Sequence, residues 1–122
     1  MLIKKQLRKM RDFHQYKVWS RGHQLALSIY KKTKSFPKEE LFGLTSQIRR
    51  AIPFNIAEGC GRRSDAEFAH FLNIAAGSAS EVEEELLLAY DLEFLEKESY
   101  LPLDKEVKEI KAMLSKLIDS IN

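Results

Sequence analysis

The segment GCGRRS, residues 59–64, combines the only cysteine of the chain with two glycines and two arginines, so phosphate binding and thiol chemistry both need consideration. A phosphate-binding P-loop reads G-x-x-x-x-G-K-[ST] after a β-strand, and neither condition is met here. A nucleophilic cysteine needs a base such as histidine within reach. His70 is the nearest histidine in sequence, and no Asn or Asp is clearly placed to orient it. We therefore predict no catalytic residue and no enzymatic activity.

Metal and cofactor patterns are equally weak. A di-iron bundle needs E-x-x-H motifs on two helices, and the sequence does not contain two of them, although four glutamates crowd into residues 81–85. A single cysteine excludes an intrachain disulfide and a Cys-rich zinc site. We predict no metal and no cofactor, and we interpret the glutamates as a solvated acidic face or as interface ion pairs.

Basic residues are the better candidates for a function, because they could contact the phosphates of RNA or DNA. They comprise an N-terminal arm and two arginine pairs: Lys4, Lys5, Arg8, Lys9, Arg11, Arg49, Arg50, Arg62 and Arg63. Arg62 and Arg63 come just before a predicted helix N-terminus, where free amides and the helix dipole favour anions. Alternatives stay open: the arm could simply be solvated, and Glu58 and Asp65 are acidic partners for the last two arginines.

A further run of lysines lies at Lys31, Lys32 and Lys34. These side chains could contact phosphates, or they could only solvate the end of a helix. An oligomer would matter here, since a weak basic patch repeated on every subunit binds a polyanion with useful avidity.

The spacing of apolar residues predicts an all-α chain of four helices. The amphipathic segments are residues 13–35, a segment opening at Pro37, residues 64–90, and a segment beginning near Pro102 or Asp104. Short connections between four helices predict an up-down-up-down four-helix bundle. We expect one domain over residues 13–122, with residues 1–12 as a separate basic arm. Pro53 is expected to kink the second helix or to end its regular part.

The turn between the second and third helices has clear structural signals. Ser64 and Glu67 have the S-x-x-E spacing of a capping box, directly before an apolar run. Gly59 or Gly61 can adopt the left-handed conformation that ends the preceding helix. We expect Cys60 to lie in this turn, where it could be exposed.

Two polar residues, Asn55 and Glu58, accompany the apolar stripe of the second helix. Buried polar groups in a bundle usually satisfy backbone groups at helix ends or fix the register of the helices. We therefore interpret both as structural. The alternative is a polar site in which they hydrogen-bond a ligand.

The third helix carries more apolar surface than one core stripe needs. Leu86, Leu87 and Leu88 are consecutive, so they point in different directions around the helix. Small residues over 75–80 would allow another helix to approach closely. A helix that is apolar nearly all round is buried on more than one side, so we predict a homo-oligomer with these three leucines at the interface.

Four segments resemble a known family: LTSQIRRA (44–51), NIAEGCGR (55–62), EFAHFLNIAAGSASEVEEEL (67–86) and VWSRGHQLALSIYKKTKSFP (18–37). They resemble the bacterial four-helix-bundle proteins named for open reading frames in intervening sequences of 23S ribosomal RNA genes. The resemblance implies a homopentamer and no enzymatic activity. It also implies kinship with the accessory variability determinant of diversity-generating retroelements, a basic pentamer that binds nucleic acid and associates with a reverse transcriptase.

The expected function is therefore that of a non-enzymatic, oligomeric accessory protein associated with RNA or DNA. The alternative is a scaffold that docks a partner protein without nucleic acid. The basic N-terminus lacks the apolar region of a secretory signal, and no apolar run reaches the length of a membrane span. We expect a cytoplasmic protein without a membrane partner.

Overall fold

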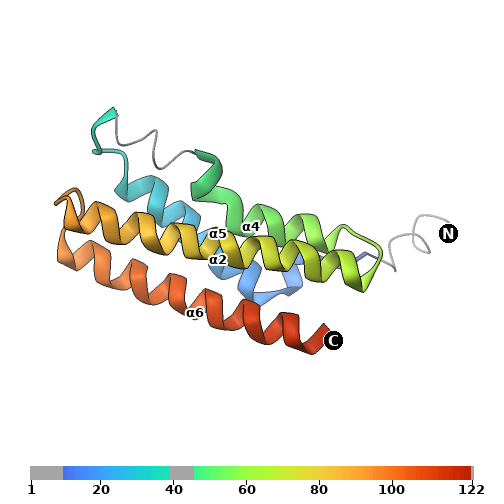
Figure 1. Cartoon of the computed structure of the whole chain (residues 1–122). Coiled ribbons are helices and arrows are strands. Elements are labelled where there is room, and N and C mark those ends of the chain that lie inside the picture. The colour runs from blue at the N-terminus through green and yellow to red at the C-terminus, as the bar shows by residue number, and fades with distance from the viewer. Residues whose placement is uncertain (1–9, 39–45, 122) are drawn as a thin grey trace.

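The computed structural model describes residues 10–38 and 46–121, and in this part the chain forms helices and no β-strand. A short 3-10 helix, η1 (Phe13–Gln15), precedes α2 (Lys17–Lys32). Three further helices follow: α4 (Ser46–Cys60), α5 (Asp65–Asp91) and α6 (Lys97–Ile121). Each helix packs against the next along the chain and α6 returns to α2, which closes an up-down-up-down bundle (Figure 1). The all-α prediction with four helices is confirmed.

The helix bounds differ from the predicted ones at two places. Residues 13–15 form η1 instead of the first turn of α2, because the Asp12 carboxylate accepts the backbone N–H of His14 and Tyr16 is extended. The last helix begins at Lys97, before Pro102, so its predicted start is wrong. A proline this near a helix start removes one backbone hydrogen bond without ending the helix.

The second helix shows a similar tolerance of proline. Pro53 lies inside α4, which continues to Cys60, so it does not end the helix. Residues 39–45, which include most of the segment predicted to open this helix after Pro37, lie outside the described residues. In the described part of the chain, no helix combines the length and the apolar character that a membrane crossing requires.

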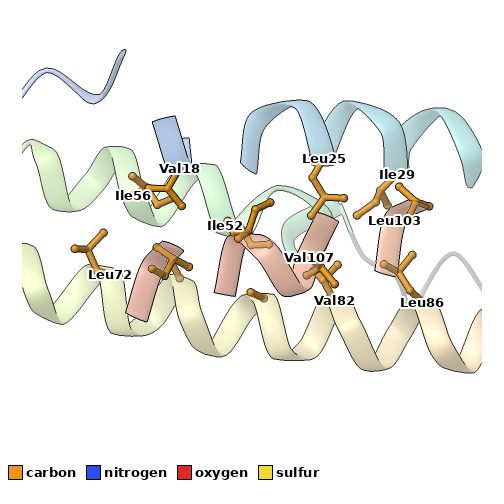
Figure 2. Packing of buried hydrophobic residues seen from close by; sticks show 14 of the residues in the cluster. Val18, Leu25, Ile29, Ile52, Ile56, Leu72, Val82, Leu86, Leu103 and Val107 are labelled. Atoms are coloured by element: carbon orange, nitrogen blue, oxygen red, sulfur yellow. The ribbon is translucent and has the colours of Figure 1, made fainter. Parts of the chain in front are cut away.

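The core consists of one apolar stripe from each helix, and Figure 2 shows these side chains meeting between the four ribbons. On α5 the stripe passes through Leu72, Ala79 and Leu86, which are at most 1% exposed. Leu86 is therefore a core residue, and its prediction as an interface residue is wrong, because heptad spacing keeps it on the inner face. Leu87 and Leu88 are 40% and 47% exposed.

The start of α5 has the predicted cap. The Ser64 hydroxyl oxygen accepts the backbone N–H of Glu67 at 3.1 Å. The Ser64 hydroxyl also lies 3.2 Å from the Glu67 carboxylate, to which it donates. Ser64 and Glu67 thus fix where α5 begins, as their spacing predicts.

Glycine acts differently from the prediction in the turn before α5. None of the glycines that the structure describes has a positive φ, so neither Gly59 nor Gly61 is left-handed. A Cβ atom on Gly59 would instead lie 3.0 Å from Phe71 Cβ and 3.2 Å from the carbonyl oxygen of Phe68. Gly59 is needed because α4 and α5 approach each other closely there.

The left-handed conformation occurs instead at Glu93, which follows α5 with a φ of 66°. Phe94 N–H donates to Ala89 O at 2.9 Å, in a Schellman-type helix end that normally favours glycine. We expect Glu93→Gly to raise the free energy of unfolding by about 1 kcal/mol, because it removes the Cβ strain. Urea unfolding measures this change. The control is Glu98→Gly, inside the first turn of α6, which should lower the free energy of unfolding by a similar amount. If both variants were more stable than wild type, this explanation would be contradicted.

Candidate nucleic-acid interface

Three of the five predicted phosphate contacts that the structure describes are engaged within the chain. The arm residues Lys4, Lys5, Arg8 and Lys9 lie outside the described residues. Arg11 forms an ion pair with Asp65, and its guanidinium carbon lies 4.0 Å from the ring centre of Phe68. The Arg11 backbone N–H donates to Cys60 O at 2.8 Å. Arg11 thus fastens the chain before η1 to the corner between α4 and α5.

Arg62 is likewise held by its neighbours. It donates to Glu58 at 2.7 Å, lies 3.6 Å from Glu67, and covers the Phe71 ring at 4.7 Å. Arg63 is exposed and has no partner among the described residues. Of this predicted pair, only Arg63 is free to meet a phosphate.

The other arginine pair is divided in the same way. Arg49 donates to the buried Thr33 hydroxyl at 3.1 Å and stacks on the Tyr30 ring at 4.0 Å, so it joins α4 to the end of α2. Arg50 is exposed and lies 5.2 Å from the ring centre of Phe54, which is itself 61% exposed. Arg50 and Arg63 are separated by most of α4, at least about 15 Å at 1.5 Å per residue, so they do not form one cluster.

Lysines at the end of α2 make the denser group. Lys31, Lys32, Lys34 and Lys38 are all exposed, and none has an acidic partner within the described residues. Arg49 contacts Tyr30 and Thr33, so the backbone of the next residue, Arg50, is also near this end of α2, while the Arg50 side chain lines the groove between α4 and α5. We call Lys31, Lys32, Lys34, Lys38 and Arg50 the basic end. Lys38 is not among the residues predicted to contact phosphates, although the segment KKTKSFPK, residues 31–38, contains four lysines and no acid.

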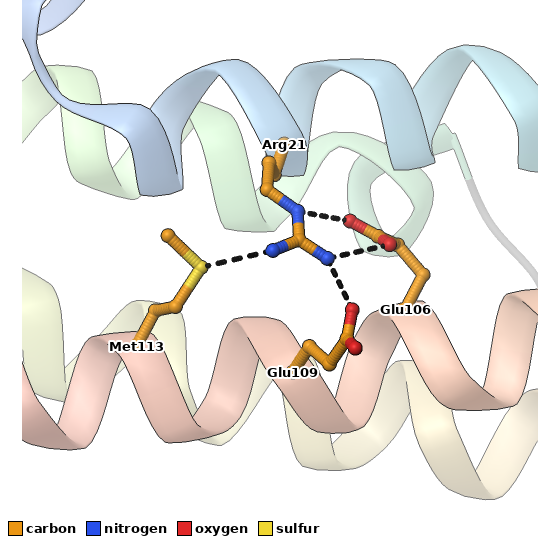
Figure 3. A network of polar contacts seen from close by, with 4 residues as sticks. All are labelled: Arg21, Glu106, Glu109 and Met113. Carbon is orange, nitrogen blue, oxygen red and sulfur yellow. Dashed lines mark hydrogen bonds and ion pairs between the residues drawn. The ribbon is translucent and has the colours of Figure 1, made fainter.

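An arginine that no sequence motif indicates, Arg21, forms the most extensive ion-pair network (Figure 3). Its Nε and Nη2 atoms donate to Glu106 at 2.6 and 2.8 Å, and Nη2 also pairs with Glu109. Nη1 contacts Met113 Sδ at 3.5 Å. The two carboxylates raise the pKa of Arg21 further above its ordinary value. Arg21 therefore ties α2 to α6 and is not available to a ligand.

Acidic and polar motif residues also have internal partners. Glu83, from the glutamate run of α5, pairs with Lys111 of α6 at 2.8 Å. Asn55 Nδ2 donates to Ala51 O at 2.8 Å, and Glu58 holds Arg62. Asn55 and Glu58 nevertheless line a shallow groove of about 420 Å³ between α4 and α5, together with Arg50, Ala51, Phe54 and Phe71. Asn55 bonds to a carbonyl oxygen of α4, and Glu58 bonds to Arg62 just after α4, which fits the structural interpretation of both residues.

Cys60 is fully buried at the end of α4, so the expectation of an exposed turn cysteine is wrong. Burial raises the pKa of its thiol to about 11. At a pH between about 9, the ordinary pKa of a cysteine thiol, and about 11, the Cys60 thiol is deprotonated in the unfolded chain but still protonated in the folded chain. Stability therefore falls as the pH rises through this window.

We expect the Cys60 thiol to resist a thiol reagent at pH 8 in the folded protein and to react fully in denaturant, because both burial and the raised pKa suppress the thiolate. A colorimetric thiol assay measures both rates. Cys60→Ser is the blank. Equal labelling rates with and without denaturant would contradict the buried position.

The fold and this surface define a class of protein, an all-α bundle with unpaired basic side chains gathered at one end. The chain belongs to the 23S rRNA-intervening sequence protein family, whose family model matches residues 14–116. This match runs from η1 through most of α6 and confirms the family that the four sequence segments indicate. No individual curated protein matches the chain.

Proposed function

We propose that this chain is a non-enzymatic, homo-oligomeric, cytoplasmic accessory protein that binds nucleic acid, RNA in the first place, through its basic end. The observation that carries the proposal is the group of four exposed lysines without acidic partners in the described chain. Arg11, Arg21, Arg49 and Arg62 are engaged internally, whereas the basic end gathers four exposed lysines within residues 31–38 of the described chain. Membership of a family named for 23S ribosomal RNA intervening sequences supports RNA as the ligand.

A plainer explanation of Lys31 and Lys32 is that they stabilise the negative end of the α2 dipole. That explanation accounts for residues in the last turn, but Lys34 and Lys38 follow α2. Five cations are more than are needed to stabilise the negative end of one helix dipole. A polyanion such as a nucleic acid would bind several of them at once.

Assembly is the second part of the proposal. Large apolar side chains are exposed on the single chain, among them Phe54, Ile74, Leu88 and Leu92. A shallow groove of about 450 Å³ between α5 and α6 is lined by small residues including Ala76, Gly77 and Ser80. Such a surface suits the close approach of a second copy. The family resemblance implies five subunits, and a ring of five would repeat the basic end on every subunit.

The test compares two triple variants with the same change of charge. Lys31, Lys32 and Lys34 are changed together to Gln; the control changes Lys97, Lys105 and Lys116, which are also exposed and unpartnered among the described residues. A filter-binding titration with structured RNA across a salt series gives the affinity and its salt dependence. We expect the first variant to lose affinity and about two units of salt slope, since each phosphate contact contributes roughly 0.7 to 0.9. Equal affinity of both variants would contradict the basic end.

A second function, docking of a partner protein, is favoured by a different surface. Exposed Leu88 of α5 and exposed Leu92, which directly follows α5, are close in sequence to the exposed acids Glu81 and Glu84. A partner protein with apolar and basic groups would complement it. Such a partner should co-purify after nuclease treatment and be lost in Leu88→Lys; recovery of the chain alone would argue against this function.

A further inference from the structure

Four aromatic rings at the start of the bundle contact one another in a continuous cluster. Two pairs are stacked, with ring centres 4.1 Å apart for Phe13 and His14 and 5.1 Å apart for Trp19 and His23. The tilted rings of Phe13 and Trp19, 4.7 Å apart, join the two pairs. Phe13 and Trp19 are partly buried against the core, whereas His14 and His23 are exposed. We call these four residues the aromatic stack. It is anchored by its inner rings and open at its two histidines.

The His14 ring is fixed in place before any ligand arrives. Its Nδ1 lies 2.8 Å from the Asp12 carboxylate, which also accepts the His14 backbone N–H at 3.1 Å. These hydrogen bonds lower the pKa of Asp12. An ionised carboxylate can only accept, so Nδ1 carries the proton in this hydrogen bond. A ligand that stacks here does not have to order this ring first.

The aromatic stack lies on one face of α2 that leads toward the basic end. Trp19, His23, Leu27 and Tyr30 follow at spacings of four, four and three, which places them along a single face of the helix, and Lys34 comes just after the end of α2. From Trp19 to Tyr30 this face is roughly 16 Å long at 1.5 Å per residue. Leu27 is 53% exposed in its middle, and Arg49 covers Tyr30 beside the lysines. We call this stripe, together with His14 and the adjoining Lys34, the α2 track.

We propose that the α2 track is a binding site for single-stranded nucleic acid, in which unpaired bases stack on His14 and His23 while phosphates pair with the lysines. This inference rests on the proposed function and specifies its ligand. Aromatic side chains for base stacking combined with a positively charged path for the backbone are how proteins hold single strands without reading their sequence. His14 and His23 can stack only with bases that are not buried in a duplex. The geometry therefore favours single strands over paired ones.

Three probes of equal length separate stacking from charge: a single-stranded RNA of about 12 nucleotides, its duplex, and an abasic strand with the same phosphates. DNA of the same sequence is a fourth probe. Trp19 is the only tryptophan, so its fluorescence reports directly on the track. We expect the single strands, of RNA or DNA, to bind at least about tenfold more tightly than the abasic strand and to quench Trp19.

The variants test the rings themselves. His14→Ala combined with His23→Ala should weaken single-strand binding about tenfold at unchanged salt slope. His14→Phe combined with His23→Phe should restore it, since stacking needs only a ring. Both pairs change exposed residues, and circular dichroism melting checks the fold. If the alanine pair binds the single strand as tightly as wild type, or if abasic and single strands bind equally, stacking is overturned while nucleic-acid binding stands. If no probe binds wild type at low salt, the proposed function fails as well.

Discussion

Gly59→Ala should lower the free energy of unfolding by about 2 kcal/mol, within the range of overpacked cores. The added Cβ would lie 3.0 Å from Phe71 Cβ and 3.2 Å from the Phe68 carbonyl oxygen. A backbone oxygen on a helix cannot rotate away, so α4 and α5 must move apart. That movement would loosen the packing of Cys60 and Phe68, which are buried beside it. The gain in helix propensity offsets only a part of this cost, because Gly59 is next to the end of α4.

Gly61→Ala is the matched control, two residues further along the same turn. A Cβ at Gly61 meets the Glu58 carbonyl oxygen at 3.5 Å, which is an ordinary contact. We expect this variant to be neutral or to gain up to about 1 kcal/mol from reduced freedom of the unfolded chain. Urea unfolding of the two variants side by side gives the difference. Equal stability of Gly59→Ala and Gly61→Ala would show that the helices do not approach as closely as described.

Gly77→Trp should convert the proposed oligomer to single subunits without unfolding them. A Cβ at Gly77 meets nothing within 4 Å, so the single chain has room for a large side chain there. In the assembly the same position would lie in the small-residue groove against another copy, where an indole cannot fit. Light scattering should therefore give a multiple of 14.2 kDa for wild type and one subunit mass for the variant.

Ala112→Trp provides the control for this experiment, because Ala112 is exposed on α6 near Lys108 and Lys116. An indole there adds the same bulk outside the groove and should leave the assembled mass unchanged. A wild-type protein that stays a single subunit at micromolar concentration would refute assembly. If Gly77→Trp stays assembled, the interface lies elsewhere, for example around the exposed Phe54.

Periodicity and capping were enough to predict the fold. The apolar stripe of α5 and the Ser64–Glu67 cap are local signals, and both appear as expected because a long amphipathic helix leaves few alternatives. The first residues of α2 and α6 were harder to predict from the sequence. Asp12 caps a 3-10 turn that has the same apolar pattern as a helix, and Pro102 looks like a start signal although the helix already exists before it.

The candidate site was less predictable, because charge in a sequence does not show which charges are paired. Arg11 meets Asp65 and Arg21 meets Glu106 across long stretches of chain, so no local motif reveals that they are engaged. Glycine was ambiguous for a similar reason. The sequence predicts that Gly59 or Gly61 ends the helix, whereas Gly59 is needed for the close contact with α5, which depends on a neighbour in space. The aromatic stack joins η1 to α2 and likewise appears only when the chain is folded.

We propose above that the exposed lysines at the end of α2 bind the phosphates of a nucleic acid. The most direct measurement is the dissociation constant of wild-type protein for one single-stranded RNA, determined over a series of salt concentrations. Contacts from three or more of the five cations of the basic end predict that log K falls with log salt at a slope of about −2 or steeper, at about 0.7 per phosphate on a single strand. A dissociation constant that does not change with salt, or no binding at low ionic strength, would contradict phosphate binding by the basic end.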